Sequence, residues 1–325
     1  MRDSRYASWP ELSYPAWRET GATLHLWTQI VGKIRLAHTP WLNHSWHVPL
    51  YVTARGLTTS TIDDGQRSFE LQFDFTRHEL EIAVSDGTRR HVPLRPQSVA
   101  AFYAAVMSVM AELEIEVHIR EAPCEIAGAV PFSADVTHAT YDPEQAERFF
   151  GALRSADRVL KRFRTGFIGK SSPVHFFWGS FDLAVTRFSG RRAPPFSGSV
   201  PGVPPAVMRE AYSHEVSSAG FWTGGAGAEY PTFYSYAYPP PPAYRQSAVR
   251  PRGAVFNESL GEFLLPYELV RSAPDPEGTL LAFLQSTYEA AAETARWDRA
   301  SLECPLGIPG VPLESSAPAQ AEEKR

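Results

Sequence analysis

The sequence predicts an α+β protein in which antiparallel sheets carry helices packed on one face. Three observations lead to this class: long stretches with apolar residues at helical spacing, short stretches with alternating apolar residues between them, and a hairpin signal at Asp86-Gly87. The chain has 325 residues, of which 43% are hydrophobic and 21% charged. That length and composition are enough to bury one large core or two smaller ones.

The first half is expected to run from a long helix through several strands to a second helix. The first helix, over 15–37, has a continuous apolar stripe and stops before Pro40. Ser98 is a suitable N-cap for the second helix, over 98–113. Between the two helices, apolar alternation or β-branched content predicts strands at 47–53, 68–75, 78–84 and 89–94.

The second half repeats the pattern of long helix, strands and closing helix. Asp142-Pro143 and Asp275-Pro276 each supply a cap and a preset first turn, which predicts helices over 143–167 and from 276 onward. The segment 172–188 is apolar on both alternating faces, as in a central strand covered on both sides. The remaining elements are a short helix at 206–211 and strands at 213–222, 232–238 and 262–270.

The two halves can be aligned on a shared order of elements. Gly32-Lys33 and Gly169-Lys170 each end a helix ahead of strands. We therefore expect a pseudo-duplication of a helix–four-strand–helix unit, with halves at 1–125 and 126–300 and a disordered tail at 301–325. The alternative is that this arrangement is common and the Gly-Lys match arises by chance.

Charge and cysteine content narrow the class of protein. The formal net charge is −5, so no overall positive field attracts nucleic acid, and the basic face of the 143–167 helix is interpreted as solvated. The two cysteines, Cys124 and Cys304, form no metal-binding pair and indicate a reducing compartment. Neither a secretory signal nor a membrane span is expected, which favours a cytoplasmic location without membrane contact.

Long blocks of sequence resemble one family of bacterial proteins known only as a domain of unknown function. The resemblance implies a bacterial cytoplasmic protein and carries no reaction, cofactor or site residue with it. It covers roughly residues 9–300 and is carried by WPEL (9–12), TLHLWTQIVGK (23–33), HVPLYVTARGLTTS (47–60), SPVHFFWGSFDLAVTRFSGRRAPP (172–195), SHEVSSAGFW (213–222), GEFLLPYELVR (261–271) and FLQSTYEAAA (283–292).

Polar residues in the 172–188 segment are the first candidates for a site. His175 and Asp182 lie among apolar neighbours, and a buried carboxylate needs a partner or a shifted pKa. The functional interpretation makes them acid–base residues, while the alternative is a core ion pair or hydrogen bond. A bulge at Gly179 would bring Asp182 to the face of His175.

A small-molecule pocket in the second half is the leading hypothesis, with an enzyme as one form of it. The chain has 8 Trp, 13 Tyr and 19 Phe, which suit pocket walls as well as cores. The catalytic candidates are His175, Asp182, His214 and Glu215, and the ligand-binding candidates are Trp178, Arg187, Trp222 and Lys170. We expect His214 and Glu215 to approach Arg187, with contact between Glu215 and Arg187 the central expectation.

Two other functions remain open from the sequence. A metal-dependent hydrolase or oxygenase would use His44, His47, His175 and His214 with Glu215. A structural or partner-binding protein would use its aromatic residues only as core. No catalytic motif is recognisable, so the sequence identifies neither a reaction nor a cofactor, and it leaves the oligomeric state open.

Overall fold

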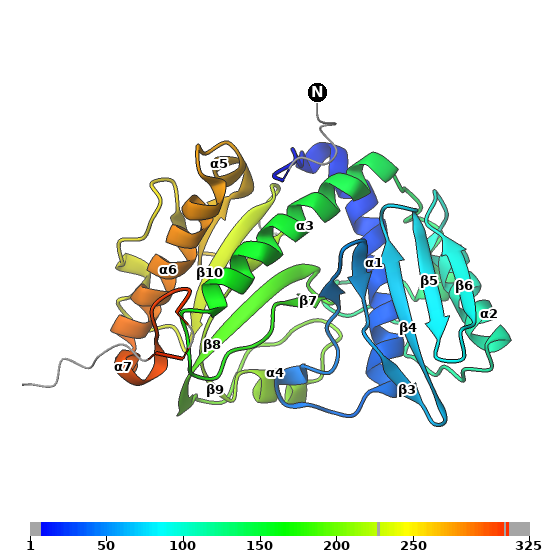
Figure 1. The fold of residues 1–325 in the computed structure, drawn as a ribbon, viewed down its shortest axis with the longest axis horizontal. Helices are drawn as coiled ribbons and strands as arrows, with labels where there is room; N and C mark the ends of the chain where they lie inside the picture. Colours follow the sequence, from blue (N-terminus) through cyan, green and yellow to red (C-terminus); the bar gives the residue numbers. More distant parts are fainter. Residues whose placement is uncertain (1–7, 226–227, 309, 312–325) are drawn as a thin grey trace, which may run out of the picture.

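The computed structural model confirms the α+β class, with two six-stranded antiparallel sheets and helices packed against them (Figure 1). It describes residues 8–225, 228–308, 310 and 311. The end of the predicted tail, 312–325, lies outside the described residues, whereas the chain up to 308 includes the short helix α7 (Arg299–Leu302). Among the helices in the described part, none is both long and apolar enough to cross a membrane.

The first half is built around the central helix α1 (Tyr14–His38), which buries an aromatic and aliphatic stripe that includes Trp17 and Trp27. The helix α2 (Val99–Glu112) begins at Ser98, whose side chain accepts a hydrogen bond from Ala101 N, as expected. The sheet order is β1-β2-β4-β5-β6, with β3 also paired to β4. These strands are β1 (Tyr51–Val52), β2 (Gly56–Thr58), β3 (Ile62–Asp64), β4 (Arg67–Asp74), β5 (Glu79–Val84) and β6 (Arg89–Pro93).

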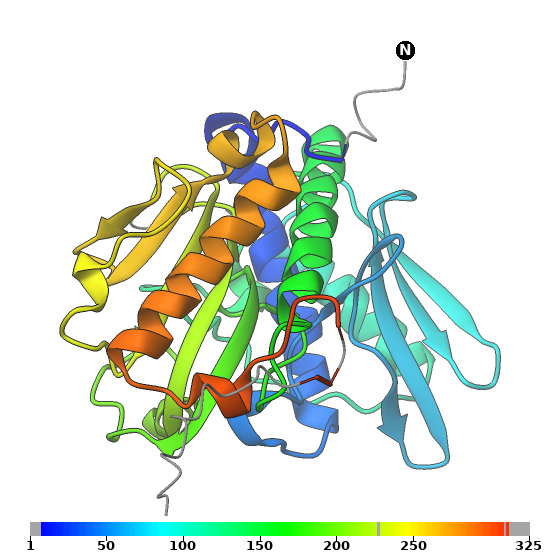
Figure 2. The ribbon, with the colours of Figure 1, turned by 60° about the vertical axis from the view of Figure 1, so that its left-hand side comes forward.

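The second half carries its two long helices on one face of its sheet. The helices α3 (Pro143–Arg164) and α6 (Pro276–Thr294) are capped by Asp142 and Asp275, as predicted. They cross the sheet side by side (Figure 2). The sheet order is β11-β12-β10-β9-β8-β7. The remaining elements are β7 (His175–Phe177), β8 (Asp182–Arg192), α4 (Pro205–Ala211), β9 (His214–Trp222), β10 (Thr232–Tyr238), β11 (Val255–Asn257), β12 (Glu262–Pro266), α5 (Tyr267–Arg271) and the 3-10 helices η2 (Asn43–Ser45), η3 (Phe132–Ala134) and η4 (Tyr244–Gln246).

The prediction of one long strand over 172–188 is wrong, because this segment folds into a hairpin of β7 and β8. Phe177 pairs with Asp182 across it, and Phe181 N donates to Phe177 O at 2.8 Å. Phe181 takes the left-handed backbone conformation, with φ of 58°, to close the turn. Two short strands with apolar residues on both faces give the same alternation as one long strand, so the pattern does not show the reversal. The predicted strand at 262–270 likewise ends at Pro266 and gives way to α5.

Trp178 leaves the sheet at the turn of this hairpin and packs on α1. The Trp178 indole lies directly on Gly32 of α1, where a Cβ would come within 2.3 Å of the ring. Its Nε1 donates to Val48 O at 2.9 Å. The packing therefore requires glycine at position 32, since only a residue without a side chain leaves room for the indole.

The register of the second sheet separates its residues into two chemically different faces. One face lies under α3 and α6 and is mainly apolar, with Leu183, Phe221 and Phe233. On the opposite face the pairing aligns a set of polar and aromatic residues. That set is Asp182, Trp222, Tyr234, Tyr236 and Glu262.

Candidate functional site

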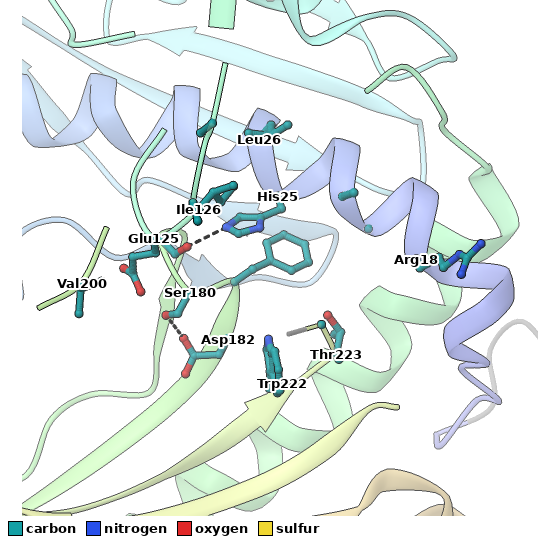
Figure 3. Close-up of a pocket in the computed structure, with 18 of the residues that line it drawn as sticks. Arg18, His25, Leu26, Glu125, Ile126, Ser180, Asp182, Val200, Trp222 and Thr223 are labelled. Carbon is teal, nitrogen blue, oxygen red and sulfur yellow. Dashed lines mark hydrogen bonds between the residues drawn. The ribbon is translucent and has the colours of Figure 1, made fainter. Parts of the chain in front are cut away.

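A cavity of about 740 Å³ lies against the polar and aromatic face of the second sheet. Pockets of this size are typical of small-molecule sites. The other walls come from the N-terminal half of α1, the loop 125–130, the hairpin turn 179–181 and α4. Residues from the two halves of the chain thus meet around one space (Figure 3).

Asp182 forms the floor of this pocket. Its carboxylate is buried and accepts hydrogen bonds from Ser180 Oγ and from the hydroxyl of Tyr234. Burial raises the pKa of Asp182, although both hydrogen bonds act in the opposite direction. The tyrosine hydroxyl, buried beside an acid, in turn has its pKa raised well above the usual range.

Glu125 reaches the same space from the loop between the halves. Gln29 of α1 fixes this loop, because its amide accepts from Cys124 N and donates to Cys124 O, both at 2.9 Å. Glu125 has a left-handed backbone conformation with φ of 60°, and its carboxyl lies so close to Gly179 that a Cβ there would come within 2.1 Å of it. Such strained backbone at a non-glycine residue is a feature of functional sites.

Among the described residues, Glu262, at the start of β12, is the third carboxyl of the pocket without an ion pair, whereas a fourth, Asp135, pairs with His138. Burial, together with the charge of Asp182, raises the pKa of Glu262 to about 7. The same two causes raise the pKa of Glu125 to about 7, although Glu125 is exposed at the mouth, where solvent weakens the effect of burial. A second cavity of about 640 Å³ adjoins the first and shares Glu262 with it.

Aromatic rings cover much of the remaining wall. Trp17 of α1 stacks on Phe149 with ring centroids 4.7 Å apart, and Phe149 stacks on Phe181 at 5.3 Å. On the sheet side the Tyr212 and Tyr236 hydroxyls are 3.0 Å apart. Aromatic residues from both halves of the chain line the pocket, namely Tyr14, Trp17, Phe181, Tyr212, Trp222, Tyr234 and Tyr236.

The basic residues that line the pocket do not neutralise these three carboxyls. Burial lowers the pKa of His25 to about 4, so this ring is neutral, and its Nε2 hydrogen-bonds Gly179 O at 2.7 Å. Arg18 pairs with Glu19 on the surface, and His138 pairs with Asp135 at 2.7 Å. Within the part of the chain that the structure describes, the carboxyls of Glu125, Asp182 and Glu262 form no ion pair.

Two residues predicted from the sequence, Asp182 and Trp222, line this pocket. Trp178 is buried against α1 instead. Lys170 lies outside the pocket, 2.7 Å from Nε2 of His44 and over the rings of Trp46 and Phe188.

Arg187 and His175 are both buried away from the pocket. Arg187 lies on the helix-covered face between the rings of Phe163 and Tyr288, at 3.5 and 4.3 Å from their centroids. Its Nη2 donates to Phe163 O, and burial lowers its pKa to about 10. Burial also lowers the pKa of His175 to about 3, and neither of its ring nitrogens has a hydrogen-bond partner among the described residues.

The expected contact between Glu215 and Arg187 is not formed. Glu215 pairs with Arg191 at 2.7 Å and accepts from Ser189 Oγ, because the bulge between Phe188 and Arg192 shifts the register at the end of β8. His214 also stays apart from this group, and its ring lies 6.0 Å from that of His44.

The four histidines of the metal alternative do not form a ligand cluster. In the described ranges, only Glu79, Glu81 and His91 place three ligand atoms within 4.8 Å of one another. They lie on β5 and β6, and Glu81 is already paired with Arg89. The set His44, His47, His175 and His214 is therefore not brought together by the fold.

Sequence reasoning missed most of the pocket's polar residues. Glu125 follows a loop without regular pattern, and Glu262 is one acid at the start of an apolar strand. A signal for the tyrosines was present, since TFYSYAY (232–238) alternates Tyr234, Tyr236 and Tyr238 against smaller or apolar residues. Such a strand has one face for the core and another for a polar or aromatic surface.

The chain belongs to a family of unknown function (DUF5996), whose sequence profile matches residues 9–304. This confirms the resemblance to a domain of unknown function. Comparison with curated proteins found no match. Comparison with solved structures found none either.

Proposed function

We propose that this protein binds a small molecule in the pocket between its two halves. The observation that carries the proposal is the convergence of three carboxyls from separate segments, Glu125, Asp182 and Glu262, on one aromatic-lined cavity. Pockets of this kind, apolar with a few convergent polar groups, are the usual form of a ligand site.

An enzyme is the second candidate, and the pKa of Glu262 favours it. A carboxyl with a pKa of about 7 can both give and accept a proton near neutral pH, which suits general acid–base catalysis. Asp182, held by two hydroxyls, would then keep Glu262 partly protonated through its charge.

The wider setting of the protein is also part of the proposal. The family resemblance supports a bacterial, cytoplasmic protein. Internal duplication is supported by the order of elements, because each half runs from a long helix through a series of antiparallel strands to a closing helix. The Gly-Lys match does not support it, because Gly32-Lys33 lies inside α1 and Gly169-Lys170 lies beyond the end of α3. The first strands of the two halves also meet. Leu50, which directly precedes β1, pairs with Phe176 of β7 through two backbone hydrogen bonds of 2.9 Å.

A ligand screen with a blocked-pocket control tests the binding proposal. Ala22 lines the cavity from α1, so Ala22→Trp fills it, while Ala104→Trp places the same ring on an exposed position of α2. A library of polar metabolite-sized compounds is screened by thermal shift and tryptophan fluorescence. We expect compounds that bind the wild type and Ala104→Trp but lose binding in Ala22→Trp. A screen without binders, or binders unaffected by Ala22→Trp, contradicts the proposal.

A further inference from the structure

We propose that the ligand of this pocket is an organic cation, a small molecule with an ammonium or amine group held between carboxylates and aromatic rings. The inference rests on the proposed function and specifies its ligand class. It is carried by three features of the pocket: unpaired acids, aromatic walls and the spacing of the acids.

The first feature is a group of three carboxyls that have no basic partner within the described part of the chain. Glu125, Asp182 and Glu262 line one cavity, and among the described residues no lysine, arginine or histidine pairs with them. Gathered carboxylates repel one another, and buried charge is costly unless it is paired. A positively charged ligand removes both costs at once. A neutral ligand such as a sugar fills the space but leaves the repulsion in place.

The second feature is the chemistry of the walls. Trp222, Tyr234 and Tyr236 lie on the sheet face beside Asp182. Aromatic faces attract cations, and ammonium groups are recognised by cages of such rings. Acids and aromatic rings therefore favour the same kind of ligand.

The third feature is the separation of the acids, which argues against a single metal ion. Ligand atoms of Glu79, Glu81 and His91 lie within 4.8 Å of one another, and the three pocket acids do not meet this limit in the described structure. One metal ion needs oxygens at 2.0–2.6 Å from a common centre. An ammonium group carried on a carbon skeleton can instead be shared among more widely spaced carboxylates.

The ionisation of the pocket predicts how binding depends on pH. Glu262 has a pKa of about 7 and must be ionised to attract a cation. Burial and the charge of Asp182 also raise the pKa of Glu125, although its exposure to solvent weakens that effect. The ionised fraction of a carboxyl such as Glu262 rises about tenfold between pH 6 and pH 8, so affinity rises about tenfold for each such carboxylate that the cation contacts. The other titratable or charged groups in this cavity are Tyr14, Asp182, Tyr212, Tyr234, Tyr236, the neutral His25, the Asp135–His138 pair and Arg18 at the rim. In the adjoining cavity Glu262 also faces Tyr238, Tyr244 and the Arg245–Glu258 ion pair.

The test compares a cation with its neutral isostere. Choline and spermidine are titrated by calorimetry against the wild type at pH 6 and pH 8, alongside 3,3-dimethylbutan-1-ol, which has the shape of choline without the charge. Manganese(II) chloride alone and glucose are titrated as well. The variants are Glu262→Gln and Glu125→Gln, with Glu112→Gln as the matched control on the exposed surface of α2.

We expect at least one cation to bind, at least tenfold more tightly than 3,3-dimethylbutan-1-ol and more tightly at pH 8 than at pH 6. Glu262→Gln or Glu125→Gln should weaken that binding about tenfold, and Glu112→Gln should leave it unchanged. The inference is overturned if neither cation binds, if the isostere or glucose binds as well as the cations, or if manganese alone binds through Glu262. If only neutral ligands bind, and they lose binding in Ala22→Trp, the cation inference fails but the proposal of a small-molecule pocket stands. If no compound in the screen binds, the small-molecule proposal and the cation inference both fail.

Discussion

Neutralising Glu262 should stabilise the ligand-free protein at pH 8 and leave its stability unchanged at pH 4. Folding raises the pKa of Glu262 from 4.5 to about 7, so the folded state holds its proton more tightly than the unfolded state. The stabilisation from this proton is fully present below pH 4.5 and is lost as pH rises through about 7. Glu262→Gln removes that loss, because glutamine does not ionise.

The magnitude follows from the size of the pKa shift. At ~1.4 kcal/mol per pKa unit the full shift corresponds to ~3 kcal/mol, and partial contact with solvent reduces this to about 1.5 kcal/mol. Urea unfolding of the wild type, Glu262→Gln and the exposed-surface control Glu112→Gln at pH 4, 6 and 8 measures the difference. If the difference in free energy of unfolding between wild type and Glu262→Gln is the same at all three pH values, the pKa of Glu262 is not raised by folding.

Two further predictions concern buried contacts, and a third concerns the relation between the two halves. Asp182→Ala leaves the hydroxyls of Ser180 and Tyr234 without their acceptor and should lower the free energy of unfolding by on the order of 3 kcal/mol. A urea midpoint equal to that of Asp63→Ala, a control in an exposed strand position, would contradict this prediction. Gly32→Ala should displace the Trp178 indole, lower the free energy of unfolding by about 1–3 kcal/mol and change the near-ultraviolet circular dichroism spectrum. An unchanged spectrum and an unchanged melting temperature would show that the indole is not displaced. The two halves should superpose in a crystal structure, with β1 and β7 in equivalent places; non-equivalent places would exclude duplication.

The elements of the fold were largely predictable from local signals. Ser98, Asp142 and Asp275 each cap the helix they were expected to cap, because capping depends on a few adjacent residues. Strands β4 and β5 were likewise predicted from alternation alone. The chain reversal between Phe177 and Asp182 was not predicted, because apolar residues on both faces give the same alternation in a hairpin as in one long strand.

The site was only partly predictable. Asp182 was identified because a carboxylate in an apolar strand is costly without partners. Its neighbours Glu125 and Glu262 come from a loop and from the start of another strand, and their convergence depends on strand register and on the Gln29 anchor. Glu215, by contrast, was placed beside the wrong arginine because one bulge in β8 moved the register.

A crystal structure of the wild type, grown with a saturating concentration of the cation that binds in the titrations, tests whether the cavity is an organic-cation site. We expect electron density for the compound inside the cavity, with its charged nitrogen within hydrogen-bonding or ion-pairing distance of Glu262 or Asp182 and beside the ring of Trp222. Density for the compound only outside this cavity, or a cavity closed by its own side chains at saturation, would contradict it.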